Sequence, residues 1–145
     1  MKTILIAIAA GTICFADSEK KIKMEDMPAA VQAAVKEQSK GATIKGFAKE
    51  VEHGKTFYEA EMIVNGHAKD ISFDPSGKIA SIEEETPIDS IPAPARETIQ
   101  KSVGTGKLKM VETVTEGEKT FYEASITTGG KSKEVKVDPA GKIVK

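Results

Sequence analysis

The chain has 145 residues, with 21 basic and 22 acidic side chains, a formal net charge of −1 and one cysteine. This balance argues against a nucleic-acid-binding protein, which would show a basic stripe. It also gives no reason to expect an anionic membrane surface as a partner. With so little cysteine, a secreted domain cannot depend on disulfides and must bury an apolar core instead.

Residues 1–16 have the pattern of a secretory signal peptide: a basic residue, an apolar run over 3–10, and a small residue at Ala16. The run is shorter than the about 20 residues that span a bilayer. We therefore expect an exported protein, periplasmic or secreted, without a transmembrane segment. Two alternatives fit less well. A buried N-terminal helix would need an amphipathic pattern, and a lipoprotein anchored at Cys14 would need a better residue before it than Ile13.

One hexapeptide occurs twice. Lys-Thr-Phe-Tyr-Glu-Ala over residues 55–60 returns unchanged over residues 119–124, 64 positions later. The same offset relates the Asp-Pro-x-Gly-Lys-Ile motif at 74–79 to its second occurrence at 138–143. Because both motifs share one offset, the sequence predicts an internal duplication. The predicted division is a signal peptide over 1–16, a flexible leader over 17–26, a first repeat over 27–82, a linker over 83–90 and a second repeat over 91–145.

Each repeat is predicted to begin with a helix. In the first repeat, Pro28 suits the first helical turn, Val31 and Val35 lie on one apolar face, and Gly41 ends the run. In the second repeat Pro92 occupies the position of Pro28. Strands are expected to follow each helix.

The strand over 56–64 has two faces. Tyr58 and Met62 alternate with Phe57 and Glu59, so we expect the first two side chains to face the helix and the other two to face away from it. Asn65-Gly66 suits a two-residue hairpin turn after this strand.

The predicted fold class is α+β: two tandem repeats, each consisting of one α-helix packed on a three- to four-stranded antiparallel sheet. One unit of this size is near the lower limit for an independent core. The two units are therefore expected to pack together or to join their sheets edge to edge, which would also remove exposed edges.

The search for catalytic residues favours a protein that is not an enzyme. His53 and His67 lack the spacing of a metal site, and no cysteine joins them. Ser72 has no nucleophile-elbow glycines around it. We predict no catalytic residues, no cofactor and no metal site.

An aromatic residue recurs on the open face of both repeats, beside acidic residues, and this predicts a binding surface. The candidate partner-binding residues are Phe57, Glu59, Glu61, Phe121 and Glu123. Two alternatives stay open. Each Phe could pack under the irregular first strand or between the units, or the opposite register could place Phe57 in the core.

These residues carry a family resemblance. A helix that starts at Pro28, the Phe-Tyr-Glu-Ala motif and the Asp-Pro-x-Gly-Lys-Ile turn resemble the PepSY-like family, also called beta-lactamase-inhibitor-like, in two tandem copies. The family consists of bacterial secreted and periplasmic proteins. The resemblance implies a helix on an antiparallel sheet whose open face grips another protein. The chain departs from the secreted inhibitors in having no tryptophan and no disulfide cysteines.

The resemblance implies a non-enzymatic binding module whose partner is a protein, either a hydrolase or another envelope protein. The competing hypothesis is a small-ligand or ion sensor of the cell envelope that uses the groove between the two repeats.

Overall fold

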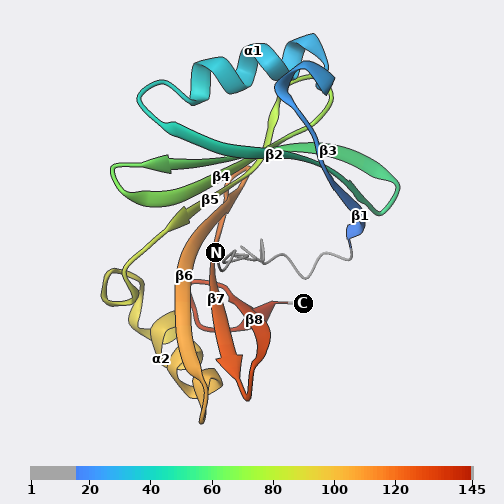
Figure 1. The fold of residues 1–145 in the computed structure, drawn as a ribbon. Coiled ribbons are helices and arrows are strands. Elements are labelled where there is room, and N and C mark those ends of the chain that lie inside the picture. The colour runs from blue at the N-terminus through green and yellow to red at the C-terminus, as the bar shows by residue number, and fades with distance from the viewer. Residues whose placement is uncertain (1–15, 145) are drawn as a thin grey trace, which may run out of the picture.

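The computed structural model describes residues 16–144, with side chains from residue 18 onward. These residues form one antiparallel sheet of nine strands in chain order, accompanied by two α-helices (Figure 1). The predicted signal peptide lies outside the described residues except for Ala16, and Cys14 lies outside them too. The strands are β1 (Ala16–Lys21), β2 (Thr43–Glu52), β3 (Lys55–Val64), β4 (His67–Phe73), β5 (Ile79–Glu85), β6 (Lys107–Glu116), β7 (Lys119–Thr128), β8 (Lys131–Val137) and β9 (Ile143–Val144).

The prediction of two tandem repeats, each with its own helix-covered sheet of three to four strands, is wrong. Residues 82–85 of β5 pair with residues 112–115 of β6, so the strands of both halves belong to one sheet and the fold is mostly β. Beyond this ladder, the Thr86 amide donates to the Val111 carbonyl oxygen at 2.8 Å. The physical reason is that two separate sheets would each leave an unpaired edge strand.

Two charged stretches that the sequence placed outside the strands belong to the sheet. Residues 17–26, expected to be a flexible leader, contain most of β1 and the short 3-10 helix η1 (Met24–Asp26). β1 pairs with β2. Residues 83–85, expected to begin a linker, form the end of β5. Charge suggested solvent-exposed coil, but a strand is held by backbone hydrogen bonds that any such residue can make.

The helices α1 (Ala29–Gln38) and α2 (Ala93–Val103) begin directly after Pro28 and Pro92, as predicted. Each covers a separate apolar cluster on the outer side of the curved sheet (Figure 1). The buried cluster under α1 contains Met27, Val31, Val35, Tyr58, Ala60, Met62, Ile71 and Phe73. The buried cluster under α2 contains Ile91, Ala95, Ile99, Val111, Ala124, Ile126 and Val137.

The repeated Asp-Pro-x-Gly turns dock each helix closely. Gly77 has φ +83°, and a Cβ there would lie 2.6 Å from the Ala30 carbonyl oxygen of α1. Gly141 also has φ +83°, and its Cβ would lie 2.5 Å from the Pro94 carbonyl oxygen of α2. Glycine is needed at both positions, because the backbone is left-handed and the helix leaves no room for a side chain.

The side chains that alternate with the core residues point to the opposite side of the sheet, which we call the inner face. On β3, Tyr58 and Met62 belong to the core under α1, whereas Phe57 and Glu59 point to the inner face and line a cavity there. The inner face is the concave side of the sheet, and both helices lie on the opposite, convex side (Figure 1). None of the helices within residues 16–144 has the length and apolar character needed to cross a membrane.

Candidate partner-binding face

The strand register gathers acidic side chains on the inner face. Glu61 on β3 is directly opposite Asp70 on β4, and Asp70 is directly opposite Glu83 on β5. Farther along the sheet, Glu112 on β6 is directly opposite Glu123 on β7. Directly opposite residues share a face, with Cβ atoms about 5 Å apart. The result is a band of carboxylates that crosses both halves of the sheet.

Several carboxylates of this band are buried. Burial is the largest cause of their raised pKa values, because it disfavours the ionised form, and the neighbouring carboxylates add to it. The pKa is raised to about 10 for Glu59, to about 6 for Asp70, to about 7 for Glu83, and to about 8 for Glu112 and Glu123. Part of the band is therefore protonated at neutral pH.

Lys136 on β8 supplies a positive charge to the second half of the inner face. It lies directly opposite Glu123. Its Nζ is 2.6 Å from Oε1 of Glu116 and 4.8 Å from the ring centroid of Phe121. The ammonium thus combines a charge-assisted hydrogen bond with a cation–π contact. Its charge also lowers the pKa values of Glu83 and Glu123, although burial raises them more.

Glu123 is the most deeply buried acid of the band. Its exposed fraction is 2%, and neither carboxylate oxygen has a hydrogen-bond partner among the described residues. A buried polar group without a partner is costly, and in a native structure it calls for an explanation such as an unseen ligand.

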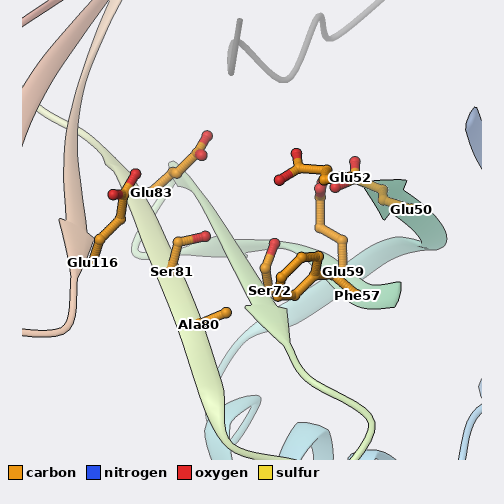
Figure 2. Close-up of a pocket in the computed structure, with 9 residues that line it drawn as sticks. All are labelled: Glu50, Glu52, Phe57, Glu59, Ser72, Ala80, Ser81, Glu83 and Glu116. Carbon is orange, nitrogen blue, oxygen red and sulfur yellow. The ribbon is translucent and has the colours of Figure 1, made fainter. Parts of the chain in front are cut away.

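A cavity of about 220 Å³ opens on the inner face of the first half. Figure 2 shows the Phe57 ring beside Ser72, with one group of carboxylates above it and another across the cavity near Ser81. The lining residues are Glu50, Glu52, Phe57, Glu59, Ser72, Ala80, Ser81, Glu83 and Glu116. The site is therefore an aromatic ring surrounded by acids.

The structure distributes the predicted partner-binding residues over one face. Phe57 and Glu59 line the cavity, whereas Phe121 and Glu123 surround Lys136 in the second half. Glu61 on β3 lies directly opposite Asp70 on β4 in the first half. The alternative register for β3 is wrong, because Tyr58 lies in the core.

Sequence reasoning missed four acids that line the cavity: Glu50, Glu52, Glu83 and Glu116. The spacing of Glu50 and Glu52 by two residues was a usable signal, because it places both on one face of a strand. Glu83 was assigned to the linker. Within residues 16–144, no three His, Cys, Asp or Glu side chains are arranged so that they could hold a metal ion.

Solved structures share this fold. A protein of Bacteroides eggerthii described as periplasmic has a TM-score of 0.66 at 18% identity, over 82% of this chain and 86% of that one. A DUF2874 family protein of Bacteroides uniformis has a TM-score of 0.62 at 20% identity, over 81% and 86%. A BLIP-like protein of Bacteroides fragilis has a TM-score of 0.57 at 20% identity, over 82% and 84%.

No family model and no curated protein matches the chain. At these identities the structural likeness establishes the fold: that of the DUF2874 and BLIP-like proteins of Bacteroides. It supports the beta-lactamase-inhibitor-like part of the resemblance seen in the sequence. The PepSY-like part stays a prediction, and the two separate tandem units are replaced by one continuous sheet.

Proposed function

We propose that the protein is exported and works in the periplasm or outside the cell as a non-enzymatic binding module. Its partner is another protein, a hydrolase or another envelope protein, and the contact is made by the inner face. The observation that carries this proposal is the cavity beside Phe57, on the side of the sheet away from both helices (Figures 1 and 2).

Two independent observations support export to the periplasm or beyond. Residues 1–16 have the pattern of a signal peptide. Among the solved structures with this fold, the protein of Bacteroides eggerthii is described as periplasmic. The BLIP-like name of the Bacteroides fragilis protein supports a role in binding another protein.

The chemistry of the inner face suits protein recognition. Phe57 is a half-buried aromatic residue in a concave site, and aromatic side chains in such positions contribute disproportionately to binding energy. The surrounding carboxylates would supply specificity, because a partner that buried them without compensating charge would bind poorly.

Affinity capture tests the proposal. The purified protein, a Phe57→Ala variant and a Lys36→Ala control are each used to retain proteins from periplasmic extract. Lys36 is exposed on α1, away from the inner face. We expect the unmodified protein and the control to retain the same protein, and Phe57→Ala to lose it. Capture that survives both Phe57→Ala and Phe121→Ala would contradict a contact through this face.

The cavity itself favours the second candidate function, a small-ligand or ion sensor of the cell envelope, because about 220 Å³ can hold a small molecule. A ligand bound only to the folded state raises the melting temperature. A thermal-shift series over metabolites and metal salts tests this function, and the absence of any shift would remove it.

A further inference from the structure

The inner face carries the same framework twice, in the same register. Phe57 is opposite Glu50 on β2, and Phe121 is opposite Val114 on β6. Glu59 is opposite Ser72 on β4, and Glu123 is opposite Lys136 on β8. Position 72 of the first half therefore corresponds to position 136 of the second half.

The second half shows how this framework holds an ammonium group. The Lys136 Nζ sits 4.8 Å from the centroid of the Phe121 ring and 2.6 Å from a carboxylate oxygen of Glu116. In the first half, the corresponding ring and carboxylate belong to Phe57 and Glu52, and both line the cavity.

The first half lacks the lysine and has an additional acid. Ser72 stands where the second half has Lys136, and Glu50 stands where it has Val114. The short serine side chain leaves the cavity of about 220 Å³ open, several times the about 30 Å³ that one water occupies in the liquid. The first half thus has the ring and the carboxyl groups of an ammonium site but no ammonium of its own, and Lys136 reaches only Glu116 at the edge of the cavity.

We propose that the cavity beside Phe57 binds the side-chain ammonium of a lysine on the partner protein, in the place that Lys136 takes in the second half. This inference rests on the proposed function and names the chemistry of the contact. The lysine Nζ lies over the Phe57 ring and donates to Glu52. The carboxyl groups of Glu50, Glu59 and Glu83 surround the charge.

A second observation concerns the acidic band beyond the cavity. Burial is the main reason that the pKa of Glu123 is raised, and the negative charge of Glu83, which lines the cavity, raises it further. Both oxygens of Glu123 lack hydrogen-bond partners among the described residues. An ammonium in the cavity would offset the charge of Glu83 and so lower the pKa of Glu123.

The aromatic wall favours an organic ammonium over a metal ion. The ring face attracts an alkylammonium group and gives its methylene groups an apolar surface. Hard cations such as Ca²⁺ instead need six to eight oxygen ligands.

Two blocked tripeptides provide the test: acetyl-Gly-Lys-Gly-amide and the same peptide with norleucine, which has no ammonium. Each is titrated into the purified protein at pH 7.5 and low salt, and the backbone amide signals are followed by NMR. We expect the lysine peptide to cause saturable shifts at Phe57, Ser72 and Ser81, and the norleucine peptide to cause none. Physiological salt should weaken the binding by screening.

Two variants show whether the peptide occupies the cavity. Ser72→Lys places an ammonium of the chain in the site and should abolish the shifts. Phe57→Leu keeps an apolar side chain but removes the ring face, and should weaken the affinity by roughly 2- to 30-fold. Equal shifts with the norleucine peptide, with CaCl₂ or in the Ser72→Lys variant would overturn the proposal.

Affinity capture separates this inference from the proposed function. A partner that Phe57→Ala loses but Ser72→Lys retains would overturn the lysine site and leave the proposed function standing. Saturable lysine-peptide binding without any captured protein would establish the site and contradict the proposed function.

Discussion

The two halves of the inner face differ in how their charge is compensated. In the second half, Val114 and Lys136 flank the aromatic and acidic framework, and Lys136 forms an ion pair with Glu116. In the first half, Glu50 and Ser72 take those places, so the carboxylates face an open cavity. The two halves share one backbone arrangement and differ at two side chains. These two differences leave the second half with an internal ion pair and the first half with a site that can receive a cation from outside.

The outer side of the sheet shows no such difference. Each half has a helix over an apolar cluster and a glycine turn pressed against that helix. Gly77 and Gly141 even share the same φ of +83°. The divergence between the halves thus lies on the inner face, which is where a binding role would need it.

The largest expected effect tests the similarity of the outer sides. Gly77→Ala and Gly141→Ala should each lower the free energy of unfolding by about 2–4 kcal/mol. Each glycine has a left-handed backbone conformation, and an added Cβ would collide with the backbone of the neighbouring helix. Urea unfolding measures the effect. Gly54→Ala is the control: it shares the positive φ but has open space around the Cβ, so only about 1 kcal/mol is expected. Unequal losses of stability at Gly77 and Gly141 would contradict the similarity of the outer sides of the two halves.

The pH dependence of stability tests the buried band as a whole. The folded-state pKa values of Glu83, Glu112 and Glu123 are raised to about 7, 8 and 8. The native state therefore retains protons that the unfolded chain releases near pH 4, and stability should fall as the pH rises from 5 to 8. We expect a negative slope throughout this range, because each retained proton lowers the free energy of unfolding by about 1.4 kcal/mol per pH unit.

Urea unfolding across this pH range measures the slope. Glu123→Gln is the matched variant, because glutamine has nearly the same shape as glutamate but does not titrate. It should reduce the dependence of the free energy of unfolding on pH. A free energy of unfolding that rises with pH would mean that the carboxylates are paired in the folded state.

Lys136→Met tests the internal ion pair of the second half. The variant keeps an unbranched side chain but loses the ammonium, and should destabilise the protein by about 1–2 kcal/mol at pH 7. Lys131→Met is the control, because Lys131 is exposed on the same strand. Its effect should stay within about 0.5 kcal/mol. Equal effects of the two variants would show that Lys136 does not compensate the band.

The smallest expected effect comes from giving the first half the two inner-face residues of the second half. The double variant Glu50→Val, Ser72→Lys should gain about 1 kcal/mol of stability at pH 7.5, because it removes a repelling carboxylate and supplies an ammonium. Ser72→Ala should change stability little. A double variant that is less stable than the natural protein would mean that the first half cannot accept the pairing seen in the second.

Local signals in the sequence predicted much of the outer side. Pro28 and Pro92 marked the helix starts, and Asn65-Gly66 marked a hairpin whose two residues do adopt positive φ. The alternation around Tyr58 placed Phe57 on the face away from the helix. Each of these inferences depends on neighbours within a few residues, where the chain's own periodicity is informative.

Local signals could not decide whether the two units pack together or join their sheets edge to edge, which is the arrangement found. The pairing of β5 with β6 joins residues about 30 positions apart, and the acidic end of β5 resembled a linker. The cavity was missed for the same reason. Its acids come from β2, β3, β5 and β6, and only the register between strands brings them together.

A crystal structure of the Ser72→Lys variant at pH 7.5 would test the comparison between the halves most directly. The account predicts that the introduced ammonium lies over the Phe57 ring, within about 6 Å of its centroid, and contacts Glu52 as Lys136 contacts Glu116. An introduced side chain that points into solvent and leaves the cavity empty would contradict it.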